Sequence, residues 1–400
     1  MDAFLVSAVR TPIGKFLGGL AGYTAVQLGA VVIAEAVRRA GVAAEEIDEV
    51  IMGQVVQAGT GQAPARQAAL RAGLPPRVPA HTTNMVCGSG LKAVMLAVHS
   101  IRAGEADLIV AGGMESMSQA PFLLPQVRQG YKYGHQQLVD ALVHDGLWCP
   151  FANWPMGAAA EHVARTCQIS RADQDRFALR SHQRAAAAWA QGAFAAEVVA
   201  VAPPAGSRSE PVRQDEGIRP ETTLDSLARL KPVFQTDGSV TAGNASQLSD
   251  GAAAIVVASG RFLQTHPRVQ PMARVVAMAM SGTEPRDLFL APVPAIRQVC
   301  AKAGIPLQAI DLLEVNEAFA AQMLACGQQL RPDGWNEERV NVHGGAIALG
   351  HPIGASGARV LTTLLHALQR YGKRYGLAAL CLGGGNAVAM IVENLGSAPQ

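Results

Sequence analysis

Short apolar runs rich in β-branched residues alternate along the chain with longer Ala- and Leu-rich stretches of helical period. An apolar run of about four to eight residues predicts a buried strand, and a longer amphipathic stretch predicts a helix. We therefore expect a helix at about 24–40 and strands at 4–9, 49–53, 108–113 and 252–258. This alternation predicts an α/β fold with buried sheets.

The two ends of the chain resemble each other. Three landmarks recur in the same order at similar separations, which is expected when one supersecondary unit is used twice. We therefore predict two similar α/β halves. The landmarks are Asp48–Ile51 with Asp311–Glu314, the helix-opening Gly90 with Gly357, and Gly112-Gly113, expected to follow a strand, with Gly383-Gly384.

The middle of the chain lacks the strand-turn-helix rhythm and is richer in polar and Pro-containing stretches. Long insertions in compact proteins usually cover a site or build an interface. We predict an N-terminal half at 1–118 with 246–270, an inserted loop domain at 119–245, and a C-terminal half at 271–400.

Composition limits the class of protein. Of 400 residues, 49% are hydrophobic and 16% charged, which excludes a disordered chain and supplies a large core. Lys and Arg number 33 against 31 Asp and Glu, and no basic stripe with interleaved aromatics occurs, so nucleic-acid binding is disfavoured. No apolar run approaches the roughly 18 residues that cross a membrane.

Cysteine usage and the chain ends bear on the compartment. Six cysteines are scattered without a CxxC pair, which argues against both a disulfide framework and a zinc site. The N-terminus lacks the features of a signal peptide, and residues 397–400 are not a peroxisomal address, so a cytoplasmic location is expected.

Cys87 is the first candidate for chemistry. It lies in the segment Asn84–Gly90 (NMVCGSG), immediately before a predicted helix. The positive end of a helix dipole lowers the pKa of a thiol and favours the thiolate, so Cys87 is a candidate nucleophile. The alternative interpretation is a small residue packed at a tight turn.

His351 is the second candidate. It lies in the glycine-rich segment GGAIALGHPIGASG at 344–357 and precedes Pro352, a residue suited to the first turn of a helix. Histidine exchanges a proton near neutral pH. A lone histidine is more often structural, but small residues on both sides let other backbones approach the imidazole, which favours a functional role.

Two further segments carry weaker signals. An apolar strand is expected to end at Cys381 before three glycines, where backbone N–H groups could form an oxyanion hole and the thiol could serve as acid or base. A cysteine in such a strand is usually core. Asn316 is expected to end a strand and begin a helix, where an N-cap is its ordinary role.

Several common motifs are missing from the sequence. The segment Gly59-Thr60-Gly61 is an incomplete dinucleotide fingerprint, and no Walker A loop, HExxH or GxSxG motif occurs. This removes the commonest nicotinamide, nucleotide-hydrolysing and serine-hydrolase interpretations.

The segments occur in the order and spacing of the thiolase family, and the resemblance covers essentially the whole chain. It implies an α/β thiolase fold, with two similar halves forming a five-layered αβαβα core and an inserted loop domain. The matching segments are AVRTPIGKFLGGL (8–20), NMVCGSG (84–90), AGGMESMS (111–118), MGAAAEHVA (156–164), TAGNASQLSDGAAA (241–254), NEAFA (316–320), GGAIALGHPIGASGAR (344–359) and CLGGG (381–385).

The resemblance implies an acyltransferase that makes and breaks carbon–carbon bonds between acyl-CoA and 3-oxoacyl-CoA, with ping-pong kinetics. Cys87 resembles the nucleophile that carries the acyl group, and His351 resembles the base that activates it. Cys381 resembles the acid/base at the methyl carbon of acetyl-CoA. Asn316 resembles the residue that orients a water which, with His351, stabilises the enolate. The N–H groups of Cys87 and Gly383 resemble a second oxyanion hole.

Coenzyme A contacts also follow from the resemblance. Ser246 and Arg219 resemble residues at the pantetheine and nucleotide ends, and Met156, Ala318 and Phe319 resemble the pantetheine channel. Acetyl-CoA, 3-oxoacyl-CoA and coenzyme A are implied as substrates, with no cofactor, metal, nucleic acid or membrane partner. The resemblance also implies a role in fatty acid or ketoacid metabolism and a homodimer or homotetramer.

Two alternatives stay open at this point. A ketoacyl synthase-like condensing enzyme shares the nucleophile corner but normally pairs its cysteine with two histidines, whereas Cys381 fits a thiolase. A catalytically silent acyl-CoA binder would be expected to lack a catalytic residue. The family pattern differs at Leu288 and Phe289, where short-chain members often have Met and Gly, so acyl-chain preference is left undecided.

Overall fold

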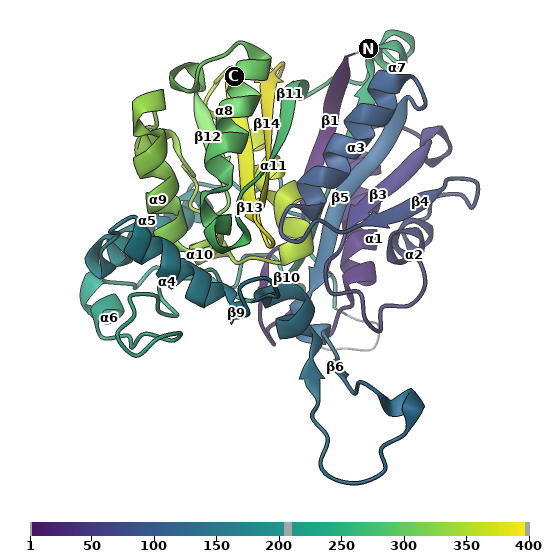
Figure 1. Ribbon diagram of the computed structural model, residues 1–400. Coiled ribbons are helices and arrows are strands. Elements are labelled where there is room, and N and C mark those ends of the chain that lie inside the picture. The colour runs from purple at the N-terminus through teal and green to yellow at the C-terminus, as the bar shows by residue number, and fades with distance from the viewer. Residues whose placement is uncertain (1, 204–209, 397–400) are drawn as a thin grey trace.

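The computed structural model describes residues 2–203 and 210–396. Residues 397–400, on which the prediction of a cytoplasmic location partly rests, lie outside the described residues. The fold is built on a large sheet with strand order β12-β13-β14-β11-β1-β10-β5-β3-β4 (Figure 1). Its strands are β1 Ala3–Arg10, β3 Glu49–Gly53, β4 Ala80–Thr83, β5 Leu108–Ser116, β10 Ser249–Ser259, β11 Ala273–Gly282, β12 Leu312–Val315, β13 Tyr375–Leu382 and β14 Asn386–Asn394, with the short β2 Gly14–Lys15 beside β10.

The sheet consists of two halves with the same pairing pattern. In the N-terminal half, β1 and β10 are antiparallel, β10 and β5 are antiparallel, and β5 and β3 are parallel. In the C-terminal half, β11, β14, β13 and β12 repeat this order and these directions. The halves meet where Phe4 and Leu5 pair with Arg274 and Ala273. The predicted repeat of two similar halves is confirmed.

Helices alternate with the half-sheets in five layers. Helices α3 (Ser89–Ala103) and α11 (Ile353–Arg370) pack on each other at the centre, and α11 contacts strands of both halves. On the outer faces, α1 (Ala25–Ala40) and α2 (Pro64–Arg71) cover the N-terminal half, and α8 (Pro292–Ala303) covers the C-terminal half (Figure 1). The α/β thiolase fold expected from the sequence is confirmed.

Individual elements follow from local sequence. The expected helix at 24–40 is α1, whose start is fixed by a capping box between Thr24 and Gln27 and whose end is fixed by Gly41 in the left-handed conformation. All four expected strands form, as β1, β3, β5 and β10.

One landmark of the repeat was interpreted wrongly. Gly112 and Gly113 lie inside β5 and do not follow it. A side chain at Gly113 would overlap the backbone oxygen of Gly354, so this glycine lets the start of α11 approach the strand. In the second half of the repeat, Gly383 and Gly384 do follow their strand, β13, and Gly384 has a left-handed φ of 80°. The two glycine pairs of this landmark therefore lie in different backbone environments.

The segment between β5 and β10 has a different character from the halves. It holds two short hairpins, and the loop between β6 and β7 extends away from the body (Figure 1). The domain boundaries given above remain predictions. The elements are β6 Phe122–Leu123, β7 Val139–Asp140, β8 Trp148–Cys149, β9 Trp154–Pro155, α4 Met156–Thr166, α5 Arg171–Ala190 and α6 Leu224–Ala228.

The remaining α-helices of the described residues are α7 Gly260–Thr265, α9 Ala320–Leu330 and α10 Ala346–Leu349. Within residues 2–203 and 210–396, no helix is both long and apolar enough to cross a membrane.

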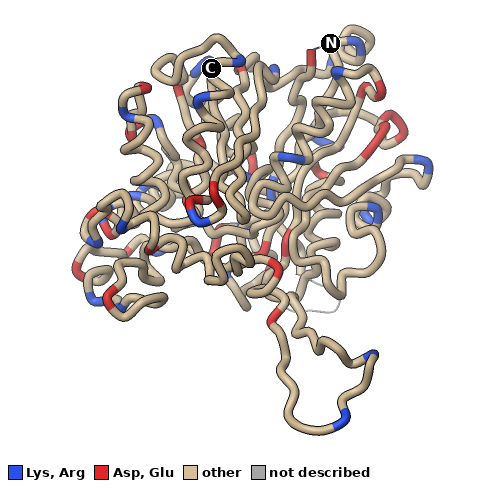
Figure 2. The backbone as a smooth tube through the Cα atoms, viewed as in Figure 1, with Lys and Arg blue, Asp and Glu red and all other residues tan. Residues whose placement is uncertain are grey.

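Figure 2 shows acidic and basic residues intermingled along the backbone of the described residues, without a continuous basic stripe.

Candidate active site

A cavity of about 660 Å³ lies between the two halves and the inserted segment. Its wall is mostly apolar. It is lined by four of the five predicted catalytic residues, Cys87, His351, Cys381 and Gly383, and by all five predicted coenzyme A contacts, Arg219, Met156, Ser246, Ala318 and Phe319. Residues from distant segments of the chain therefore meet around one space.

Cys87 lies two residues before the start of α3, at a tight turn. The turn is held by the side chain of Asn84, which accepts a hydrogen bond from the N–H of Val86 at 3.0 Å, and by Ser89 Oγ, which accepts one from the N–H of Met85 at 2.9 Å. Val86 has a φ of 47°, an unusual conformation for a β-branched residue. Such strain is tolerated where the surrounding contacts fix the backbone.

The protonation state expected for Cys87 was wrong. Burial raises the pKa of Cys87 to about 12, and Glu115 adds to the increase. The backbone N–H groups of Gly383 and Cys87 act in the opposite direction but do not offset burial. The helix start therefore does not by itself produce a thiolate, and the thiol needs a base.

His351 supplies a base of the correct tautomer. Its Nδ1 lies 2.6 Å from Ser356 Oγ, and that hydroxyl donates to the carbonyl of Pro352 at 2.9 Å. Because the hydroxyl hydrogen is already used, Ser356 accepts the Nδ1 hydrogen, and Nε2 keeps its lone pair. Burial, reinforced by the charge of Arg359, lowers the pKa of His351 to about 3. The imidazole is therefore neutral in the unliganded site.

Asn316 adjoins this imidazole. It directly follows β12, and its Nδ2 donates to His351 Nε2 at 3.4 Å. Its Oδ1 is buried and has no partner among the described residues, which leaves an acceptor for a water or a substrate group. The N-cap interpretation was wrong, because α9 begins only at Ala320 and its N-cap is Phe319.

Cys381 lies near the end of β13 and faces the same cavity. Burial raises its pKa well above the usual value, and the nearby Cys87 raises it further. Two thiols that interact in this way titrate as a pair. Gly383 follows β13, and its N–H, like that of Cys87, lies close enough to the Cys87 sulfur to lower its pKa.

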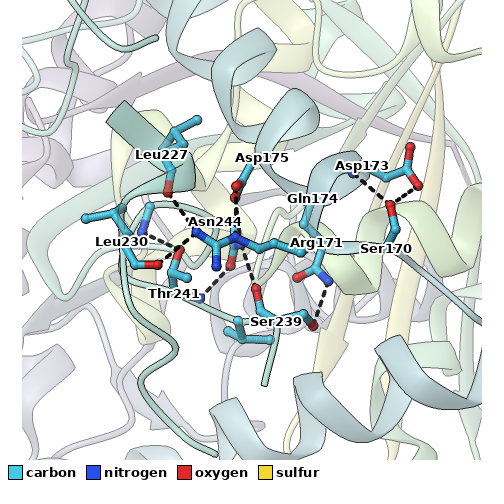
Figure 3. Close-up of polar contacts among 12 residues, drawn as sticks. Ser170, Arg171, Asp173, Gln174, Asp175, Leu227, Leu230, Ser239, Thr241 and Asn244 are labelled. Atoms are coloured by element: carbon cyan, nitrogen blue, oxygen red, sulfur yellow. Dashed lines mark hydrogen bonds and ion pairs between the residues drawn. The ribbon is translucent and has the colours of Figure 1, made fainter. Parts of the chain in front are cut away.

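A polar network in the inserted segment surrounds the turn at residues 241–244, shortly before Ser246 (Figure 3). Arg171 donates to the carbonyls of Leu227 and Leu230 at 2.7 and 3.0 Å. Asp175 pairs with Arg171 at 2.8 Å and accepts from Asn244 at 3.0 Å. The network fixes the turn that precedes Ser246.

The far side of that turn is joined to the C-terminal half. Ser246 donates its N–H to the carbonyl of Ala318 at 3.0 Å. Phe319 packs edge-on against Phe289, with ring centroids 5.3 Å apart, and against Phe234 at 6.4 Å. These aromatic side chains form part of the apolar wall of the cavity that Cys381 and Arg219 also line.

The sequence analysis missed Ser356 and gave Glu115 no role. Both lie inside segments that carried the resemblance, so the available signal was a polar side chain in an otherwise small and apolar motif. Within the part of the chain that the structure describes, no group of three or more His, Cys, Asp or Glu side chains could hold a metal ion.

Comparison with known proteins agrees with this geometry. The model of the thiolase N-terminal domain matches residues 3–261, and that of the thiolase C-terminal domain matches residues 269–394. A protein of Cupriavidus necator named acetyl-CoA acetyltransferase is 51% identical over 394 residues, covering 98% of this chain and 99% of its own. One of the same name from Pseudomonas aeruginosa is 50% identical, covering 97% and 98%.

A solved structure has the same architecture. The crystal structure of the Bacillus anthracis acetyl-CoA acetyltransferase superposes with a TM-score of 0.95 at 41% identity, covering 98% of this chain and 99% of that one. Family models that span nearly the whole chain, close relatives and this superposition agree. The chain belongs to the thiolase family and is an acyltransferase.

Proposed function

We propose that this thiolase transfers acetyl groups between coenzyme A thioesters, joining acyl-CoA and acetyl-CoA to 3-oxoacyl-CoA and catalysing the reverse cleavage. One observation carries the proposal: Cys87, His351 and Cys381 open together into a single cavity, with Asn316 hydrogen-bonded to the imidazole. The relatives named acetyl-CoA acetyltransferase support acetyl-CoA as a substrate.

The first half of the proposed reaction loads an acyl group on Cys87. His351 Nε2 takes the thiol proton as the sulfur attacks the thioester carbonyl. The N–H groups of Cys87 and Gly383 stabilise the tetrahedral oxyanion. Coenzyme A leaves with the proton of the Cys381 thiol, so that Cys381 becomes a thiolate while His351 stays protonated. A neutral thiol and a neutral imidazole are suitable partners, because the charges form only as the reaction proceeds.

The second half forms the carbon–carbon bond. Cys381, as thiolate, removes a proton from the methyl group of a second thioester, acetyl-CoA. The protonated Nε2 of His351 and a water on Asn316 donate to the enolate oxygen, and the carbanion attacks the acyl-Cys87 carbonyl. Collapse of the intermediate releases 3-oxoacyl-CoA and the Cys87 sulfur, which takes back its proton from His351. Thiolysis is the reverse sequence, with Cys381 returning the proton to carbon.

The coenzyme A chain occupies the apolar part of the cavity in this proposal. Met156, Ala318 and Phe319 line the pantetheine channel, Ser246 lies beside it, and Arg219 meets the nucleotide end. Coenzyme A thioesters are substrates, and no separate cofactor is required by these steps.

Neither alternative is favoured. A condensing enzyme of the ketoacyl synthase type pairs its cysteine with two histidines. Among the described residues that line this cavity, His351 is the one histidine, and Cys381 lines the same cavity. A silent binder would lack a reacting group, and each group named above is present.

The proposal also includes the oligomeric state and the cellular location of the protein. The loop between β6 and β7 exposes apolar side chains, including the fully exposed Tyr133, which supports a homodimer or homotetramer. A cytoplasmic location and a role in fatty acid or ketoacid metabolism rest on the family resemblance.

The test measures thiolysis of 3-oxoacyl-CoA thioesters of increasing chain length, together with exchange of the methyl protons of acetyl-CoA. We expect the wild type to cleave acetoacetyl-CoA and Cys87→Ala to lose turnover completely. Cys381→Ser should still be acylated at Cys87 but should stop proton exchange. Turnover in Cys87→Ala at a tenth or more of the wild-type rate, or unchanged exchange in Cys381→Ser, would contradict the assigned roles.

A further inference from the structure

Glu115 is a fully buried carboxylate close to the cavity with no role in the steps above. It lies in β5, is 0% exposed, and accepts three backbone hydrogen bonds. The donors are the N–H groups of Val55 at 3.0 Å, Val56 at 3.2 Å and Gly354 at 2.9 Å. Both oxygens of the carboxyl group are therefore used as acceptors.

The first two donors belong to the surroundings of the nucleophile. Val55 and Val56 pack in the apolar cluster against which Cys87 lies. The carbonyl of Val55 accepts a hydrogen bond from Asn84 Nδ2 at 3.4 Å, and Asn84 also holds the turn of Cys87. Glu115 is thus linked to the Cys87 turn through residues 55 and 56.

The third donor belongs to the helix that follows the base. Gly354 is the second residue of α11, whose N-cap Pro352 adjoins His351. A Cβ at Gly354 would lie 2.6 Å from Glu115 Oε2 and 2.9 Å from the Cα of Gln54, so a glycine is needed for this contact. The carboxylate therefore caps the positive end of α11 from a neighbouring strand.

Glu115 also acts on the Cys87 thiol through its charge. It is one of the groups that raise the pKa of Cys87, after burial. Burial raises the pKa of Glu115 itself to about 8, against the effect of its three donors. The titratable groups that interact with Glu115 are Asp250 on β10 and Cys87.

We propose that Glu115 is a positioning residue for the reaction: its carboxyl group holds the Cys87 turn and the His351 helix in register, and once it is ionised its negative charge opposes a free thiolate at Cys87. The thiol is then ionised only when His351 takes its proton beside a bound thioester. The positioning role rests on the proposed function, because it is tested by thiolysis kinetics. The effect of the Glu115 charge is tested separately, by the reactivity of the Cys87 thiol.

The experiment compares Glu115→Gln, which removes the charge, with Glu115→Asp, which keeps the charge but shortens its reach. Thiolysis kcat and KM are measured, and the rate of Cys87 alkylation by iodoacetamide is followed between about pH 7 and pH 10. Glu161→Gln is the matched control, because it removes another buried carboxylate, one that accepts from the N–H groups of Ser239 and Val240 and not from residues 55, 56 or 354.

We expect Glu115→Gln to lower kcat at least tenfold with little change in KM. Above about pH 8, where Glu115 is ionised in the wild type, its alkylation should be several-fold faster, because a thiolate next to a neutral amide is more stable than one next to a carboxylate. Glu115→Asp should lose kcat but keep the wild-type alkylation curve. The control should change neither quantity by more than about twofold.

Two results would overturn the proposal. A kcat within twofold of the wild type in both Glu115 variants would remove the positioning role, and an unchanged alkylation curve in Glu115→Gln would remove the electrostatic role. If Glu115→Gln does not fold, the kcat and alkylation curve of Glu115→Asp decide. A wild type without thiolysis would refute the proposed function, while the alkylation curves would still test the charge of Glu115.

Discussion

His351 can serve as a base only while Nε2 carries a lone pair, and Ser356 secures this. The Ser356 hydroxyl gives its hydrogen to Pro352 and so can only accept from Nδ1. Orientation of a catalytic imidazole by a neighbouring acceptor fixes both its tautomer and its ring plane. The hydroxyl therefore contributes to the reaction without touching a substrate.

We expect Ser356→Ala to lower kcat about tenfold with little change in KM, since one buried hydrogen bond contributes about 1 kcal/mol. Steady-state thiolysis kinetics measure both quantities. Ser281→Ala is the control, because Ser281 also donates to a helix-start carbonyl, that of Ala291 at 2.7 Å, and does not line the cavity. An unchanged kcat in Ser356→Ala would show that packing alone orients the imidazole.

At the scale of elements, glycines lie at the contact between α3 and α11 and allow the two helix backbones to approach closely. A Cβ at Gly90 would lie 2.7 Å from the backbone nitrogen of Ala358, and a Cβ at Gly357 would overlap the backbone nitrogen of Leu91. Close approach of the two helices brings the Cys87 turn and His351, each just before a helix, to one cavity. The helix crossing thus decides the distance between nucleophile and base.

Gly357→Ala should lower the melting temperature and reduce kcat. Overpacking costs about 1–3 kcal/mol, which exceeds the gain of up to about 1 kcal/mol from the better helix propensity of alanine. Thermal unfolding and thiolysis rates check this. Gly260→Ala is the matched control, because its new methyl group would meet only Phe4 at 3.5 Å, an ordinary contact. A more stable and fully active Gly357→Ala would contradict the close crossing.

At the scale of the whole molecule, Arg10 joins the N-terminal half to the inserted segment. Its guanidinium, with 0% side-chain exposure, pairs with Glu197 at 2.6 Å and with Asp215 at 2.7 Å. Burial alone would lower the pKa of Arg10, but the two carboxylates outweigh it and raise the value. Thr363 of α11 also donates to Glu197, so the central helix shares this network.

Arg10→Met should lower the free energy of unfolding by about 3–5 kcal/mol, because two buried carboxylates lose their counter-charge. The loss should be greatest near neutral pH and smaller as the pH falls, since unpaired buried carboxyls have raised pKa values and take up protons. Urea unfolding at several pH values measures this.

Arg38→Met is the control for Arg10→Met. It removes an exposed partner of Glu35, and such surface pairs contribute less than about 1 kcal/mol. An equal decrease in the free energy of unfolding in the two variants would show that the buried network contributes no more to stability than the surface pair.

The sequence by itself determined the elements and the candidate residues. Apolar periodicity located α1 and strands β1, β3, β5 and β10, and motif spacing singled out Cys87, His351 and Cys381. These features depend on neighbouring residues, so they can be recognised before folding is considered. The repeat was also visible, because each half encodes its own order of strands and helices.

Only the tertiary structure decided how these residues behave. Burial, which depends on contacts between segments far apart in the chain, reversed the expected pKa shift of Cys87 and made His351 a neutral base. Long-range contacts also assigned Glu115 its three donors and placed Asn316 against His351 and not at a helix cap. Desolvation and convergence are properties of the packed molecule, which no local pattern contains.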